Sequence, residues 1–274
     1  MTDHSAKVEA GPVCGFIGLG SQGAPIARRM IDAGLPTVLW ARRAETLAPF
    51  RETPAQIAHS IAELAASAEH VGVCVIDDAA VLAVCDALIP AMRPGGRIVI
   101  HSTTLPRTCR AVAGQARRYG VSVLEAPVSG GAPAAEAGTL TVMSAGQAEV
   151  LEQARPVLQT FSHRIIHLGD HGAAQAAKLV NNSLLAANLA LAHHALAAGA
   201  ALDLDRGSLI ELLQASSGRS FGLEVLSRQP SLEAFENGRS LAEKVRLLSE
   251  ASNEATRPVD GLHRAVACVW GTQL

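Results

Sequence analysis

The chain has 274 residues, of which 49% are apolar, and a formal net charge of −2 at pH 7. This length allows one large domain or two modest ones, and the near-neutral charge gives no electrostatic basis for binding nucleic acid or an anionic membrane. The five cysteines lack CxxC spacing and neighbouring histidine pairs, so we expect free thiols in a reducing cytoplasm and no metal site.

The first 170 residues alternate short strand-like runs with helix-like stretches, which is typical of a parallel sheet covered by helices. Each strand-like run follows Gly, Pro or a polar residue and is rich in Val and Ile. We expect strands at 13–19, 36–41, 70–76, 96–102 and 120–126, with 138–146 and 163–169 extending the sheet at its edge.

After residue 170 the strand-like runs stop and helical periodicity continues almost to the end of the sequence. We therefore predict an α/β protein, with a doubly wound N-terminal sheet of the Rossmann type over residues 1–170 and an all-α domain over residues 171–274.

Residues 183–204 form a nearly continuous run of Ala and Leu. Asn188, His193, His194 and the shortage of bulky side chains argue against a membrane span, so a helix buried between domains or subunits is the better interpretation. The apolar surface of 172–200 predicts a homodimer or a higher homo-oligomer. The polar first twelve residues contain no apolar signal core, which favours a cytoplasmic protein.

A glycine-rich segment follows the first predicted strand and opens the first predicted helix. In this context a GxGxxG motif predicts a dinucleotide site, because the glycines allow a tight turn and the free amides of the helix start can hold a pyrophosphate. Its residues are Gly18, Leu19, Gly20, Ser21, Gln22 and Gly23.

The end of the next predicted strand distinguishes the two nicotinamide nucleotides. NAD sites usually carry an acidic residue there, whereas this chain has Arg42 and Arg43. Guanidinium groups would clamp a ribose phosphate, so NADP is favoured and NAD is the alternative. In a chain with 20 arginines, one of the pair could equally be a plain surface charge.

Several dehydrogenase chemistries use such a fold. A short-chain dehydrogenase needs Lys four residues after a Tyr, but Val123 follows the single tyrosine, Tyr119, at that spacing. The Cys and His ligands of metal-dependent alcohol dehydrogenases are not found in the sequence either. What remains resembles the β-hydroxyacid dehydrogenase family, in four motifs that occur in the family's order: GFIGLGSQGAPIARRM (15–30), STTLP (102–106), APVSGGAPAAEAGTLTVMSAG (126–146) and GAAQAAKLVNN (172–182).

The resemblance implies roles for the matching positions. Lys178 would be the general acid/base, and Asn182, one helical turn away, would orient the substrate. The substrate carboxylate would bind at Ser129, Gly130 and Gly131. Further residues would border the cofactor or the substrate pocket: Ile76, Asp77 and Thr103 beside the cofactor, Lys244 in contact with it, and Phe221 at the pocket.

The use of lysine supports this role for Lys178. The chain has three lysines, Lys7, Lys178 and Lys244, and otherwise uses arginine for positive charge. A proton shuttle must exist in two protonation states, and arginine effectively keeps its proton. A lysine buried among alanines near another cation has a pKa lowered from about 10.4 toward neutrality. The alternative is a lysine that extends from its helix into solvent.

The motifs therefore predict an NAD(P)-dependent oxidoreductase that acts on a small β-hydroxy acid or its semialdehyde, similar to 3-hydroxyisobutyrate dehydrogenases and tartronate semialdehyde reductases. An imine reductase-like enzyme is one alternative, although such enzymes usually carry Asp or Tyr in place of the lysine. A catalytically silent nucleotide-binding module is the other, because Val245 replaces the family's Asp after Lys244 and the C-terminal helical region is expected to be shortened.

Overall fold

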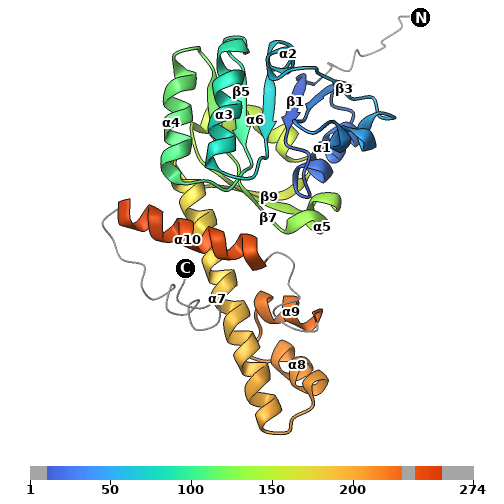
Figure 1. Cartoon of the computed structure of the whole chain (residues 1–274), viewed down its shortest axis with the longest axis vertical. Coiled ribbons are helices and arrows are strands. Elements are labelled where there is room, and N and C mark those ends of the chain that lie inside the picture. Colours follow the sequence, from blue (N-terminus) through green and yellow to red (C-terminus); the bar gives the residue numbers. More distant parts are fainter. Residues whose placement is uncertain (1–10, 230–237, 255–274) are drawn as a thin grey trace, which may run out of the picture. The chain divides into compact units, whose positions relative to one another are not determined.

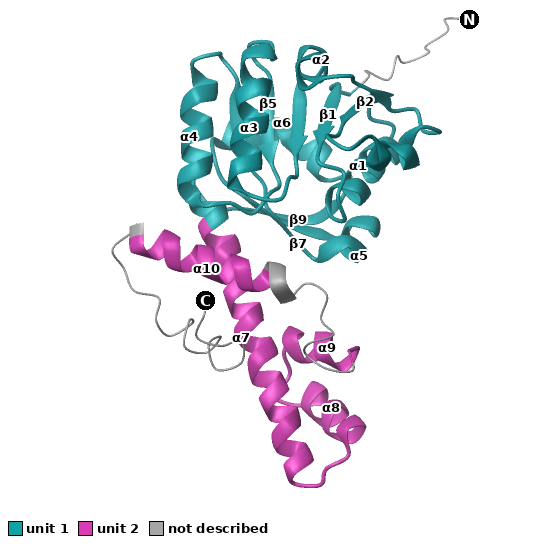
Figure 2. Cartoon of the chain, in the orientation of Figure 1, with its two compact units in different colours: residues 1–175 teal, residues 176–274 magenta. Residues whose placement is uncertain are grey.

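The structure is a computed structural model that describes residues 11–229 and 238–254 of the chain (Figure 1). The chain divides into two compact units, residues 1–175 and residues 176–274 (Figure 2). The division falls after Gln175, inside a long helix and slightly beyond the boundary at residue 170 that the sequence suggested.

Unit 1 is built on a six-stranded parallel sheet with the strand order β3-β2-β1-β4-β5-β6. Strand β1 pairs with β2 on one side and with β4 on the other, so the winding of the chain reverses between β1 and β4. Doubly wound sheets bind their ligands at this reversal, beyond the carboxyl ends of the strands. The strands are β1 (Cys14–Ile17), β2 (Thr37–Trp40), β3 (Gln56–Ile57), β4 (His70–Val73), β5 (Arg97–Ile100) and β6 (Ser122–Glu125).

Helices cover both faces of this sheet, because successive side chains of each strand point to opposite faces. Phe16 packs with helices α1 and α6 in one core cluster, whereas its neighbour Ile17 packs with α2, α3 and α4 in another. This arrangement confirms the doubly wound sheet expected from the sequence. The helices are α1 (Gly23–Asp32), α2 (Ile61–Ser67), α3 (Asp78–Leu88), α4 (Pro106–Arg117) and α6 (Ala148–Leu158), with short 3-10 turns η1 (Ala44–Phe50) and η2 (Ile89–Ala91).

The last two predicted strands of unit 1 form, but they do not extend the main sheet. They are β8 (Leu140–Ser144) and β9 (Ser162–His167) of a separate three-stranded sheet that also contains β7 (Val128–Ser129). An isolated bridge between Glu125 and Ala145 links it to β6. Pro127, which has no N–H to donate, ends β6, and the chain then turns into β7 and the short helix α5 (Gly131–Glu136).

The long helix α7 (Ala173–Ala201) begins at the end of unit 1 and continues as the first helix of unit 2. By length and by a mean hydropathy of 1.4 it could cross a membrane, although the core helix of a soluble protein passes the same test. Its buried face packs on other helices: Leu189 shares a core cluster with Leu223 of α9 and Val245 of α10. The other described helices of unit 2 are α8 (Arg206–Ala215), α9 (Phe221–Ser227) and α10 (Gly238–Glu254).

Candidate active site

The glycine loop 18–23 joins β1 to α1 and lies at the β1/β4 reversal of the sheet. A Cβ at Gly18 (φ +100°) would lie 2.1 Å from the carbonyl oxygen of Cys74, and one at Gly23 would lie 1.9 Å from the carbonyl oxygen of Gly18. Both positions therefore exclude any side chain. A Cβ at Gly20, in contrast, would have nothing within 4 Å, so the backbone there is open to a ligand.

The start of α1 fits the pyrophosphate of a dinucleotide. The first turn of α1 contains no acidic residue, and the side chain of its N-cap, Gln22, does not cap the helix. Among the described residues the buried Nε2 of Gln22 has no hydrogen-bond partner, so it is a donor without an acceptor. The Ala24 N–H donates to the Gly20 carbonyl at 2.9 Å and Pro25 has no N–H, so the open glycine and the unpaired amide donor are the features here that suit a bound anion. Leu19 is buried in the core beside them, and Ser21 is exposed.

Arg42 and Arg43 follow β2 and are exposed. The Nε of Arg43 lies 3.8 Å from Oε1 of Glu45, whereas Arg42 has no ion-pair partner within the described part of the chain. Arg28, in the other nearby arginine pair, is held over the ring of Phe50 at 4.9 Å from its centroid. Of the arginines described near the end of β2, Arg42 is therefore the one free to meet a phosphate.

Ile76, Asp77 and Thr103 lie in the loops that follow β4 and β5, the strands next to β1. The carboxyl ends of parallel strands meet at one sheet edge, so these loops lie at the same edge as the glycine loop. The side chain of Ile76 is 77% exposed, which leaves an apolar surface at this edge. Oδ1 of Asp77 accepts a hydrogen bond of 2.8 Å from the Ala80 N–H and caps α3, so this carboxylate already has a structural role.

The predicted carboxylate loop joins β7 to α5 within unit 1. Ser129 ends the strand, and Gly130 and Gly131 follow with φ of +129° and +72°. A Cβ at Gly130 would lie 2.5 Å from Cβ of Ala134, so the turn requires glycine there for space as well as conformation. Consecutive main-chain N–H groups in such a turn form a concave anion site.

Lys178 and Asn182 are four residues apart on α7 and therefore share a helix face. Burial, together with the positive charge of Lys244 on α10, lowers the pKa of Lys178 from 10.5 to about 8. Asn182 is buried, at 8% exposure, and Lys178 is half-buried. Near neutral pH this amine can hold or release a proton at small cost, which is what general acid–base catalysis needs.

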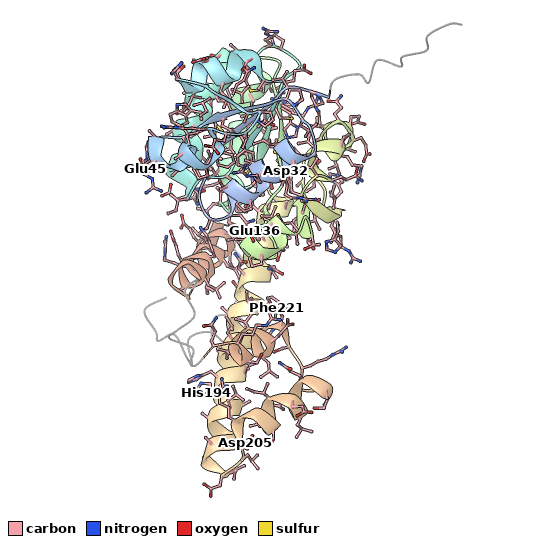
Figure 3. All side chains as sticks on the ribbon, turned by 90° about the vertical axis from the view of Figure 1, so that its right-hand side faces the viewer. Asp32, Glu45, Glu136, His194, Asp205 and Phe221 are labelled. Atoms are coloured by element: carbon pink, nitrogen blue, oxygen red, sulfur yellow. The ribbon has the colours of Figure 1, made fainter. Side chains whose placement is uncertain are left out.

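Phe221 begins α9 and is 59% exposed (Figure 3). It lines a cavity of about 610 Å³ within unit 2, together with Arg219, Glu224 and Arg228. Lys178 does not line this cavity. The assignment of Phe221 to the substrate pocket therefore stays a prediction.

Two buried polar residues escaped the sequence analysis. Glu125, the last residue of β6, and Gln175, in the first turn of α7, are both 0% exposed. A sequence signal exists for each: Glu125 ends an apolar run immediately before the APVSGG motif, and Gln175 interrupts an alanine run three residues before Lys178.

Comparison with known families agrees with the fold and these motifs. Residues 13–169 match the NAD binding domain of 6-phosphogluconate dehydrogenase, and residues 172–257 match the NAD-binding region of NADP-dependent 3-hydroxyisobutyrate dehydrogenase. A 3-hydroxyisobutyrate dehydrogenase of Pseudomonas aeruginosa is 34% identical over 248 residues, which cover 86% of this chain and 81% of the relative. The chain belongs to the β-hydroxyacid dehydrogenase family.

Other known proteins are similar to this chain over most of their length. An NAD-dependent L-serine dehydrogenase of Pseudomonas aeruginosa is 36% identical over 228 residues, or 79% of this chain and 74% of that enzyme. Among solved structures, 3-hydroxyisobutyrate dehydrogenase of Mycobacterium tuberculosis with L-serine has a TM-score of 0.84 at 25% identity, covering 93% of this chain and 91% of that one. Psf3 in complex with NADP+ and 2-OPP has a TM-score of 0.73 at 27% identity, with coverages of 89% and 95%.

The open space over Gly20 gives a test of the dinucleotide site. We expect Gly20→Val to fold like the parent protein, because a Cβ there meets no atom within 4 Å, and to bind nicotinamide nucleotides at least about tenfold more weakly. Gly114→Val is the matched control, since Gly114 of α4 is equally open. Fluorescence titration with reduced nucleotide measures the affinity, and an unchanged affinity of Gly20→Val would place the nucleotide elsewhere.

Proposed function

We propose that this protein is an NAD(P)-dependent dehydrogenase that transfers a hydride between the nicotinamide and a small β-hydroxy acid or its semialdehyde, such as 3-hydroxyisobutyrate or tartronate semialdehyde. The observation that carries the proposal is the half-buried Lys178, which shares a face of α7 with Asn182, in a chain whose other unit has an open glycine loop. Burial and the charge of Lys244 lower the pKa of this lysine to about 8. Relatives named for 3-hydroxyisobutyrate, L-serine and 2-(hydroxymethyl)glutarate support the substrate class. Each of these compounds carries a hydroxymethyl group next to the carbon that bears its carboxylate.

The proposed reaction transfers a hydride and a proton, and different groups handle each of them. When bound, the nicotinamide nucleotide supplies the hydride acceptor for oxidation and the hydride donor for reduction. In the oxidation, the neutral Nζ of Lys178 takes the hydroxyl proton while the C–H hydride leaves the carbinol carbon, which becomes an aldehyde. In the reduction, the protonated Nζ returns the proton to the aldehyde oxygen as that oxygen becomes a hydroxyl.

The remaining residues hold and orient the reactants. Main-chain N–H groups at Gly130 and Gly131, with the Ser129 hydroxyl, bind the substrate carboxylate. The amide of Asn182 orients the hydroxyl that loses its proton. Such positioning can account for a large part of the rate enhancement, because it removes the entropy cost of aligning the reactants.

Several side chains complete the proposed site around the nicotinamide. Thr103 borders it from the loop after β5, with Ile76 and Asp77 in the loop after β4. Lys244 contacts the bound nucleotide in addition to lowering the pKa of Lys178, and Phe221 shapes the substrate pocket.

Replacement of Lys178 tests the function. We expect Lys178→Met to lose about 10²- to 10⁴-fold in kcat with 3-hydroxyisobutyrate, L-serine or related hydroxy acids, while nucleotide affinity stays within about twofold. In the parent protein, kcat for oxidation should rise with pH through about 8, because the base must be neutral, and kcat for reduction should fall over the same range. Full turnover by Lys178→Met would eliminate the proposal. If the parent protein binds nucleotide but turns over none of these substrates, it is a catalytically silent nucleotide-binding module.

The charge of Lys244 gives a matched pair of variants for the same measurement. Lys244→Gln removes the neighbouring cation, so the midpoint of the kcat profile should move above 8 toward the ordinary lysine value. Lys244→Arg keeps the cation and should keep the midpoint. These profiles are recorded at saturating nucleotide because Lys244 is also assigned to the cofactor.

For the cofactor, we propose a preference for NADP. The support is the exposed Arg42 at the end of β2, which has no ion-pair partner among residues 11–229 and 238–254; an acidic residue there would repel a ribose phosphate. Charge-assisted hydrogen bonds to a phosphate contribute about 1.5–3 kcal/mol.

Arg42→Ala should therefore raise KM for NADP at least about tenfold and leave KM for NAD nearly unchanged. Arg43→Ala should have the smaller effect because Arg43 faces Glu45 at 3.8 Å. Steady-state kinetics with both nucleotides measures the ratio. A parent protein that prefers NAD would contradict the assignment.

We further propose a cytoplasmic homodimer or higher homo-oligomer. Val180, Leu184 and Leu191 of α7 are 48–61% exposed, and large apolar side chains gathered along a helix favour a subunit contact. Light scattering should give at least twice the mass of the 28.4 kDa chain. A monomeric mass at micromolar concentration would contradict the proposal.

A further inference from the structure

The first turn of α7 is anchored by a buried carboxylate. Glu125, at the end of β6, accepts hydrogen bonds from the N–H groups of Gly172 and Gln175, the second at 3.2 Å. The Nδ1 of His171 lies 3.6 Å from the same carboxylate. A negative group in contact with free N–H groups stabilises a helix start, so Glu125 fixes where α7 begins relative to the main sheet of unit 1.

The side chain of Gln175 extends this anchor to the Thr103 turn. Its Oε1 accepts a hydrogen bond of 3.0 Å from the N–H of Thr104, and its Nε2 donates one of 3.0 Å to the carbonyl of Ser102. One fully buried amide therefore holds both residues that flank Thr103.

The same turn is tied to the rest of the sheet edge. The Ser102 hydroxyl accepts a hydrogen bond of 2.8 Å from the N–H of Val75, which follows β4. On the other side of the turn, Oδ1 of Asp78 accepts from the Leu105 N–H at 2.9 Å and from the Thr108 hydroxyl. Thr103 thus lies in a loop with little freedom to move.

We propose that Gln175 is a positioning residue, which fixes the first turn of α7, the helix that carries Lys178, on the Thr103 turn. The proposal rests on the proposed function of Lys178. Lys178 follows Gln175 by three residues in one continuous helix, so the two side chains lie on neighbouring turns of the same face. A displacement of about 1 Å in such a site can cost about 100-fold in rate.

The chemistry of the amide makes the role specific. Gln175 uses an acceptor and a donor at once, and a glutamate, which only accepts, would place an oxygen against the Ser102 carbonyl. Methionine has a similar length and flexibility but supplies neither hydrogen bond, so Gln175→Met removes the link while filling most of the space.

A double-mutant cycle separates positioning from general support of the fold. We expect Gln175→Met to lower kcat about 10- to 100-fold in the parent protein and less than about twofold in the Lys178→Met background, where no proton shuttle remains to be positioned. Nucleotide affinity and binding stoichiometry should match the parent in each case. Gln115→Met is the control, because it removes a 3.0 Å side-chain hydrogen bond to Asp86 at the surface and should leave kcat unchanged.

Equal fold-losses in the two backgrounds, or a parental kcat for Gln175→Met, would overturn the inference. Failure of the proposed function itself is recognised separately, by full turnover of Lys178→Met alone. If Gln175→Met does not fold, Gln175→Asn serves in the same double-mutant cycle. Asparagine keeps the amide, but its side chain is one methylene shorter, so the amide does not reach the Thr104 N–H and the Ser102 carbonyl. Its loss of kcat should likewise vanish in the Lys178→Met background, and a loss that persists there would refute the positioning role.

Discussion

The side chain of Lys178 on α7 is partly removed from water, which disfavours its charged ammonium form. The positive charge of Lys244 on α10 disfavours that form further, so the pKa of Lys178 falls to about 8. Both effects act on the charged form and reduce the cost of releasing the proton. An arginine at the same place would stay charged and could not take the proton-transfer role proposed for Lys178. The acid–base chemistry proposed for this protein depends on this lowered pKa of Lys178, which is set by its partial burial and by the nearby charge of Lys244.

Unit 1 contributes backbone constraints rather than reactive side chains to the proposed site. Gly18 and Gly23 are closely packed against carbonyl oxygens, so neither position in the loop at the β1/β4 reversal admits a side chain, whereas the backbone at Gly20 is open. The buried bonds of Glu125 and Gln175 fix the start of α7 on the same unit. A hydride transfer needs such rigid placement because the reacting atoms must approach to about 3–3.5 Å.

The sequence located the elements of unit 1 well where the signal was local. Runs of Val and Ile located most strands of the main sheet, and the glycine motif located the turn between the first strand and the first helix, because both patterns follow from local backbone requirements. The three-stranded sheet was missed as a separate sheet because β7 has only two residues. Glu125 and Gln175 were missed because their partners lie 47 and 71 residues away in the chain, and only the fold brings them together. Likewise, burial could be guessed for Lys178, but the neighbouring cation could be identified as Lys244 only from the structure.

Because the sequence contains three lysines, the protonation of Lys178 can be observed directly. A titration of protein labelled with ¹³C at the lysine side chains, followed by NMR and assigned with Lys7→Arg, Lys178→Met and Lys244→Arg variants, gives the pKa of each amine. The account predicts a Lys178 resonance that titrates near 8, clearly below the ordinary lysine value of 10.5. A Lys178 resonance that titrates near 10.5 in the folded protein would contradict it.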